Sequence, residues 1–330
     1  MKQYSTNDIV SGKIEFGKLQ ITEELKSWQD VINGEIVSLC RGLPAGSQTE
    51  AFLMLMNYAG LNIGDKFDFF KKYYPCLWNI LAHIAGLQKS GGPENFSEII
   101  KSHAMAMFLH SIEDHLIDGE LSPDILILLI HAEAWRIYRT NLDKISEFTG
   151  TNKDYIDKYL DRYFSSICSD PENPTLEDYC AHFRNQMANI TLLADLCAVS
   201  VNIEEDKKAD MLESFECFGI AWRLLDDIND FEEDFASGTR NACFYALDSG
   251  GQSLYESISG QKRGQSPDTT QARNTLIQHM DTEKTLITII DAIISYLKRG
   301  AEAAFRSGIN GFGEELLEMA SPIEKKFYSS

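Results

Sequence analysis

The stretch that decides the fold is WRLLDDINDFEEDFASGTRN, which runs from Trp222 to Asn241. Six of the nine positions that begin at Asp226 carry a carboxylate, and apolar residues stand between and before them. Apolar residues at this spacing predict a helix that packs on a core. On that helix Asp226, Asp230 and Asp234 are four residues apart and share a face, where each like-charged pair costs about 0.2–0.5 kcal/mol.

A second acidic row stands in HSIEDHLIDGE, residues 110–120, where Asp114 and Asp118 are also four residues apart. Gly119 follows, so we expect this helix to end near Asp118. Carboxylates in a last turn face the negative end of the helix dipole, which costs about 0.3–1 kcal/mol each. Two such rows predict that cations complete the arrangement, and a set of oxygen donors favours Mg²⁺.

Neither row has a lysine or arginine four positions away. Arg223 stands four residues before Asp227, a spacing at which two side chains meet on a helix, so we expect a local ion pair there. The alternative to a metal site is that both rows are solvated, charged helix ends.

Composition limits the function classes. The chain has 330 residues with 50 acidic and 30 basic side chains, a formal net charge of −20. Such a field repels nucleic acids and anionic membrane surfaces, so we expect neither as a partner. Seven cysteines form no CxxC pair, the first residues lack the apolar run of a signal peptide, and no apolar run is long enough to span a membrane. These features predict a soluble cytoplasmic protein.

Helical periodicity dominates the chain, and strand-like alternation is nearly absent. The pattern predicts one all-α domain over residues 1–330, with 1–20 as a peripheral segment. The expected helices are 21–41, 47–60, 66–88, 95–119, 122–148, 153–168, 175–202, 204–236, 240–258, 268–300 and 313–328.

Both acidic rows resemble motifs of the class I isoprenoid synthase superfamily, which includes prenyltransferases and terpene cyclases. DHLID, from Asp114 to Asp118, resembles the first motif, DDxxD, with His115 in place of the second aspartate. WRLLDDIND resembles the FQxxDDxxD of chain-elongating prenyltransferases, and DDINDFEED resembles the NDxxSxxxE of cyclases. DFEED is also similar to the second DxxxD of squalene and phytoene synthases. The resemblance implies a helical bundle around a deep central cavity.

A third segment, HFRNQMA, is similar to the part of bacterial terpene cyclases that senses diphosphate. The resemblance implies that Arg184 contacts the diphosphate and that Met187 and Ala188 stand at a helix break. The expected Arg–Tyr pair near the C-terminus is missing, because YLKRGAEAAFRSG offers Lys298, Arg299 and Arg306 without it. Arg240, just after the second acidic row, is the other candidate for the diphosphate.

The resemblance implies a Mg²⁺-dependent enzyme that binds a prenyl diphosphate through three metal ions. The implied metal ligands are Asp114, Asp118, Asp226, Asp230 and Asp234, with Arg184 and Arg240 on the diphosphate. Asp114, Asp118, Arg184 and Asp226 are the implied catalytic residues. A homodimer is also expected, since this superfamily is often dimeric.

The branch within the superfamily stays open. Chain-elongating enzymes carry a GGKxxR-like motif for isopentenyl diphosphate, whereas only Lys71 and Lys72 stand near that place here. Head-to-head enzymes carry more basic residues around the second motif. A terpene cyclase, which is a lyase acting on one prenyl diphosphate, is therefore the leading hypothesis. The alternatives are a prenyltransferase, which joins two substrates, and a non-catalytic helical protein that binds a metal or a basic partner through its acids.

Overall fold

The computed structural model describes residues 5, 6, 9, 12–87, 96–117, 119, 121–260 and 267–328. Within these residues every regular element is a helix, so the predicted all-α class is confirmed. The helices are α2 (Glu23–Arg41), α3 (Ala45–Tyr58), α4 (Cys76–Ala85), α5 (Phe96–Ile117), α6 (Ile125–Thr149), α7 (Lys153–Ile167), α8 (Leu176–Gln186), α9 (Ala188–Ser200), α10 (Glu205–Asn229), α11 (Phe231–Ser237), α12 (Ala242–Tyr245), α13 (Ser249–Ile258), α14 (Pro267–Glu283), α15 (Thr285–Ser307) and α16 (Asn310–Tyr328).

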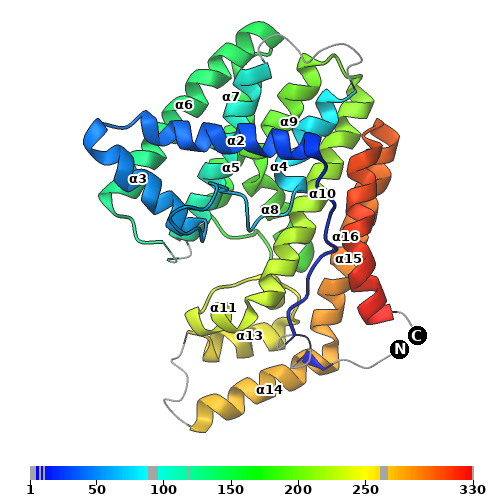
Figure 1. Ribbon diagram of the computed structural model, residues 1–330. Coiled ribbons are helices and arrows are strands. Elements are labelled where there is room, and N and C mark those ends of the chain that lie inside the picture. The colour runs from blue at the N-terminus through cyan, green and yellow to red at the C-terminus, as the bar shows by residue number, and fades with distance from the viewer. Residues whose placement is uncertain are drawn as a thin grey trace.

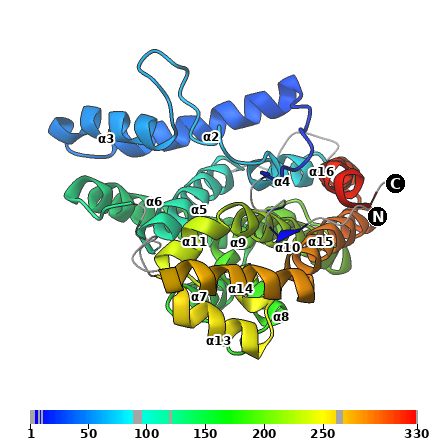
Figure 2. The same cartoon turned by 90° about the horizontal axis from the view of Figure 1, so that it is seen from below.

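The long helix α10 runs through the middle of the bundle and packs against α15, which in turn packs against α16 (Figure 1). Helix α5 packs against α6 and α9. Seen from below, α2 and α3 form a layer on the side opposite α13 and α14 (Figure 2). No helix in the described part of the chain is long and apolar enough to cross a membrane.

Polar residues fix where several helices begin. The side chains of Thr22, Asp124, Asn152 and Thr175 each accept a hydrogen bond from an amide in the first turn of α2, α6, α7 and α8. Such caps stabilise a helix by about 1 kcal/mol each. They explain why the predicted starts of these helices lie within a few residues of the observed ones.

Four predicted helices are each two helices in the structure: 175–202, 204–236, 240–258 and 268–300. The first breaks at Met187, where the resemblance to cyclases implied a break, and the second breaks at Asp230. The last breaks at Lys284, whose backbone is left-handed with a φ of 55°. Apolar periodicity continues across these breaks, so it carries no signal for them.

The predicted helix 66–88 is helical only over α4, because residues before Pro75 form turns. Proline lacks the amide hydrogen that a helix interior needs and disfavours a helical conformation in the residue before it. The turns keep aromatic residues of this segment, among them Phe69 and Phe70, in the core.

The N-terminal segment differs from the expected peripheral position. Ile14 and Phe16 are buried. The Asn229 side chain accepts a hydrogen bond from the Ile14 amide and donates one to the Ile14 carbonyl, both at 3.0 Å. The amide of Gly17 donates to the Met319 carbonyl at 3.1 Å. This segment therefore joins the end of α10 to α16.

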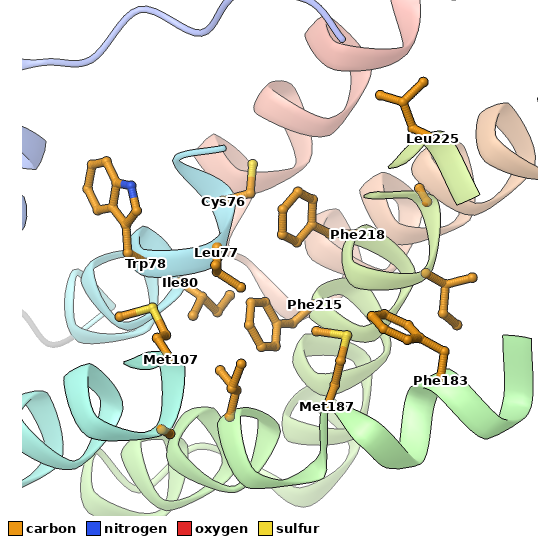
Figure 3. Close-up of a cluster of buried hydrophobic side chains, with 14 of the residues drawn as sticks. Cys76, Leu77, Trp78, Ile80, Met107, Phe183, Met187, Phe215, Phe218 and Leu225 are labelled. Carbon is orange, nitrogen blue, oxygen red and sulfur yellow. The ribbon is translucent and has the colours of Figure 1, made fainter. Parts of the chain in front are cut away.

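Met187, the residue at the break between α8 and α9, packs closely against Gly219 of α10. Met187 is buried and lies next to Phe183 and Phe215 (Figure 3). A Cβ atom at Gly219 of α10 would lie 1.9 Å from the Met187 sulfur. The absence of a side chain at Gly219 therefore leaves the space that the Met187 side chain occupies.

We predict that Gly219→Ala destabilises the protein by about 1–3 kcal/mol, because the methionine has to leave a packed core. In a Met187→Ala background the same substitution should be neutral or stabilising, since alanine is favoured over glycine in a helix by about 1 kcal/mol. Urea unfolding of the four proteins in this double-mutant cycle measures both effects. An equal cost in the two backgrounds contradicts the proposed fit.

Candidate functional site

Asp114 of the first acidic row, on α5, lies close to the part of α10 that carries the second row. The clearest link is between Arg223 of α10 and Asp114 of α5, where Nη1 and Oδ1 lie 3.4 Å apart. Burial raises the pKa of Asp226, and charge repulsion from Asp114 is one of the smaller contributions that add to it. The two rows therefore act on each other electrostatically across the space between the helices.

The first row stands at the C-terminal end of α5. The helix ends at Ile117, and Gly119 follows with a left-handed φ of 74°, so the predicted helix end is confirmed. Asp118 lies outside the described residues. His115 is hydrogen-bonded beside the row, with its Nδ1 2.6 Å from the Tyr58 hydroxyl.

The second row crosses the junction of α10 and α11. The amide of Asp230 donates to the Asp226 carbonyl, and the amide of Asp234 donates to the Asp230 carbonyl, each at 2.9 Å. These bonds keep the helical spacing of four residues across the break. The Asp234 carboxylate accepts a hydrogen bond of 2.5 Å from the Asn241 side chain.

Burial raises the pKa of both Asp226 and Asp234 to about 7. Repulsion from Asp230, Asp227 and Asp114 adds to the effect at Asp226, while Arg223 opposes it. Part of the Asp226 side chain is accessible to water, but protein surrounds the carboxyl group on most sides, and this surrounding protein is what raises its pKa. The ionised row is therefore costly without a cation.

Arg223 and Asp227 form the predicted ion pair, with 3.0 Å between Nε and Oδ1. Asp227 is buried and also accepts hydrogen bonds from the Tyr179 hydroxyl at 2.6 Å and from the Ala242 amide at 2.8 Å. With its oxygens occupied in this way, Asp227 holds Arg223 and α12 in place. The contact of Arg223 with Asp114 was not predicted, because it depends on where the bundle places α5 relative to α10.

A cavity of about 610 Å³ opens beside this contact. Its walls come from α5, α7, α8, α10 and the segments around 168–171 and 238–245, and most of the lining groups are polar. They include His110, Glu113, Asp114, Tyr163, Asp170, Tyr179, His182, Gln186, Arg223, Arg240 and Tyr245.

Arg240 lies at this cavity, as its candidate role requires. Its Nη2 lies 2.5 Å from Glu256, its Nη1 lies 3.8 Å from Asp170, and the guanidinium stands over the Phe244 ring. The side chain is partly exposed and bordered by acids. An incoming anion would therefore have to compete with two carboxylates for it.

Arg184 is not brought to this cavity. It lines a separate cavity of about 520 Å³, where its Nε lies 3.2 Å from Glu216. The residues of α8 that face the first cavity are Tyr179, His182 and Gln186, and Arg184 points to the other side of the helix. Helical geometry separates His182 and Arg184 by about 200° around the axis, which is the physical reason.

The basic residues of the C-terminal part lie near Arg184 or farther away. Arg299 lines the same second cavity, and its Nε lies 3.2 Å from Glu213. Arg306 pairs with Asp210, and Lys298 pairs with Glu324. These pairs do not replace the missing Arg–Tyr pair at the acidic rows.

Glu113 is a buried carboxylate next to Asp114 that sequence reasoning missed. It accepts hydrogen bonds from His131 at 2.6 Å, from Trp135 at 2.7 Å and from the Tyr163 hydroxyl. These donors come from α6 and α7, so they fix the last turn of α5. The only sequence signal was the adjacent acid in IEDH, which does not indicate burial.

Aromatic side chains cover the other side of the acidic rows. Tyr73 lies against Trp222 with ring centroids 5.9 Å apart, and it stacks with Phe69 at 6.2 Å. The pKa of Tyr73 is raised chiefly by burial, with smaller contributions from Asp114 and Asp226. An aromatic wall therefore stands close to both rows.

The described part of the chain contains no group of three His, Cys, Asp or Glu side chains that could by itself hold a metal ion. Mg²⁺ is often held by only one or two carboxylates, with water and phosphate oxygens completing its shell. The oxygen donors and the raised pKa of Asp226 and Asp234 fit that kind of site.

No protein-family model matches the sequence, and no curated protein is significantly similar to it. Solved structures share its fold. Geranylgeranyl pyrophosphate synthase from Corynebacterium glutamicum matches 98% of this chain and 99% of its own, with a TM-score of 0.69 and 12% sequence identity. The same enzyme complexed with isoprenyl diphosphate and magnesium matches 94% of this chain and 99% of its own, with a TM-score of 0.58 and 11% identity.

Decaprenyl diphosphate synthase from Rhodobacter capsulatus matches 94% of this chain and 99% of its own, with a TM-score of 0.62 and 12% identity. At such low identities the likeness establishes the fold. The chain thus has the helical bundle of prenyl diphosphate synthases, in agreement with the fold that the acidic motifs implied.

The raised pKa values lead to a prediction for stability. Because the pKa of Asp226 is about 7 in the folded protein and about 3.9 in an unfolded chain, the folded state binds more protons between these values. Its contribution to stability therefore falls as the pH rises from about 4 to about 7. We predict that Asp226→Asn raises the melting temperature most above about pH 7 and progressively less towards about pH 4.

Thermal melting across this pH range, without added divalent metal, measures the effect. Glu233→Gln is the matched control, because it removes an exposed carboxylate from the neighbouring turn of α11. If Asp226→Asn raises the melting temperature equally at every pH, the Asp226 carboxyl does not have a raised pKa in the folded protein.

Proposed function

We propose that the protein is a Mg²⁺-dependent prenyltransferase that ionises a prenyl diphosphate and passes the allylic cation to a second molecule. The observation that carries the proposal is the contact between Arg223 of α10 and Asp114 of the first acidic row, at a polar cavity that both residues line. The names of the similar structures, which are prenyl diphosphate synthases, support a transferase over a lyase.

Magnesium is the cation that this donor set fits. The residues that would hold it are Asp114 and Asp118 on one side and Asp226, Asp230 and Asp234 on the other. One of the similar structures is described as complexed with isoprenyl diphosphate and magnesium. When bound, Mg²⁺ would supply positive charge to the diphosphate that leaves in the reaction.

The other groups of the site have roles that follow from their positions. Arg240 at the cavity edge would bind diphosphate oxygens with charge-assisted hydrogen bonds. Tyr73 and Trp222 would keep water from the reacting carbon and favour a nearby cation through their ring faces. Arg184 has no part in this scheme, because it faces the second cavity.

A terpene cyclase is the second candidate, and two observations favour it. Lys71 and Lys72 are exposed and line none of the described cavities, so they do not supply an evident site for isopentenyl diphosphate. The helix break at Met187 also matches the arrangement that the cyclase resemblance implies. A transferase with a non-isoprenoid acceptor is compatible with both observations.

One assay separates these candidates. The purified protein is incubated with Mg²⁺ and geranyl, farnesyl, geranylgeranyl or geranylfarnesyl diphosphate, each alone and with isopentenyl diphosphate. Product that needs a second substrate supports the transferase, and hydrocarbons or alcohols from one substrate support the cyclase. If no diphosphate is released and Mg²⁺ with pyrophosphate leaves the melting temperature unchanged, the protein is a non-catalytic helical protein.

In the active enzyme, Asp114→Ala and Asp226→Ala should each abolish turnover, because each removes a carboxylate from a different side of the metal site. Circular dichroism and melting should show an intact fold for both. Asp206→Ala, an exposed acid at the far end of α10, is the control and should keep full activity. Near-normal turnover in either site variant means that the metal assignment is wrong.

A further inference from the structure

Arg223 is anchored firmly on one side. Its Nε lies 3.0 Å from both the Asp227 carboxylate and the Tyr179 hydroxyl, and the guanidinium stands 5.8 Å from the Phe183 ring centroid. Asp227 is only 3% exposed and has further donors in Tyr179 and the Ala242 amide. This side of the guanidinium is therefore part of the fixed packing between α8, α10 and α12.

The other side of Arg223 is held loosely. Its Nη1 lies 3.4 Å from Asp114 Oδ1, which is longer than the 2.7–2.9 Å typical of charge-assisted hydrogen bonds. The Asp114 side chain is 39% exposed, so water competes for the same oxygen. The contact with Asp114 is thus the one that a stronger anion can replace.

The position of Arg223 gives such an anion access. The residue lines the 610 Å³ cavity together with His110, His182 and Arg240. Arg240 is already paired with Glu256 at 2.5 Å, whereas the Asp114 side of Arg223 has only the long contact. In the motif FQxxDDxxD, which this stretch resembles, the position of Arg223 is a glutamine, so the cation distinguishes this chain from that motif.

We propose that Arg223 binds the diphosphate directly and that a diphosphate oxygen replaces Asp114 on its guanidinium. The exchange releases Asp114 towards Mg²⁺, so that anion and metal bind cooperatively. Without a ligand, this contact holds Asp114 of the first acidic row to Arg223 of α10. This inference rests on the proposed function, which supplies the diphosphate as ligand.

Calorimetric titration with inorganic pyrophosphate in the presence of EDTA tests the proposal without turnover. The wild-type protein should bind pyrophosphate without metal. Arg223→Gln should weaken that binding about tenfold or more, the loss expected for one charge-assisted hydrogen bond in a recess. Asp114→Asn should strengthen it, because the competing carboxylate is gone.

Asp226→Asn is the matched control for Asp114→Asn. It removes the same charge from a carboxylate that also feels the Arg223 charge, but no contact joins Asp226 to the Arg223 guanidinium among the described ion pairs. We expect Asp114→Asn to tighten metal-free binding severalfold more than Asp226→Asn. Equal gains in affinity would mean that the loss of one negative charge anywhere near the site strengthens binding, and they would contradict the proposed exchange at Arg223.

Arg223→Gln leaves Asp227 without its cation and can therefore unfold the protein. Arg223→Lys keeps a charge at Asp227, and melting curves identify which variants are folded. If neither variant folds, the comparison of Asp114→Asn with Asp226→Asn decides. Unchanged pyrophosphate affinity in a folded Arg223→Gln protein, or no metal-free binding by the wild type, overturns the proposal.

Failure of the proposed function gives a different result. Prenyl diphosphates would then yield no product with Mg²⁺, even though the pyrophosphate titrations behaved as expected. In the opposite case, the wild type turns over prenyl diphosphates while Arg223→Gln binds pyrophosphate as the wild type does. The two ideas can therefore fail independently.

Discussion

The burial of carboxylates close to one another is the constraint on which the rest of the site depends. Burial is the largest cause of the raised pKa of Asp226, and Asp230, Asp227 and Asp114 raise it further, so the ionised carboxylate carries a cost. Arg223 offsets part of that cost, because its guanidinium lies between Asp227 and Asp114. The hydrogen bonds of Glu113 fix the last turn of α5, and the backbone bonds of Asp230 and Asp234 keep the second row in helical register.

Much of the fold could be predicted from the sequence, because helix signals are local. Gly119 predicted the end of α5, and the spacing of Arg223 and Asp227 predicted their ion pair. The breaks at Asp230 and Lys284 could not be predicted, since apolar periodicity runs through them. Proline is an exception: Pro75 was a visible signal for the start of α4, and a prediction that weighed it would have shortened the helix 66–88.

The site was only partly predictable, because its geometry depends on which helix faces meet. The acidic rows needed only a spacing of four residues, and Asp114 of the first row lies near enough to Asp226 of the second to add to its raised pKa. Arg184 was assigned from a motif, yet its position on α8 turns it towards Glu216. Glu113 was passed over because nothing in its sequence neighbours indicates that His131 and Trp135 reach it from α6.

The tie between Ile14 and Asn229 has a consequence for how the molecule is assembled. The segment that carries Ile14 and Gly17 is made before its partners, because Asn229 and Met319 belong to much later parts of the chain. Contacts of such large sequence separation form slowly, because a long loop must close before they do. The contact of Gly17 can therefore form only after the chain has been made as far as Met319.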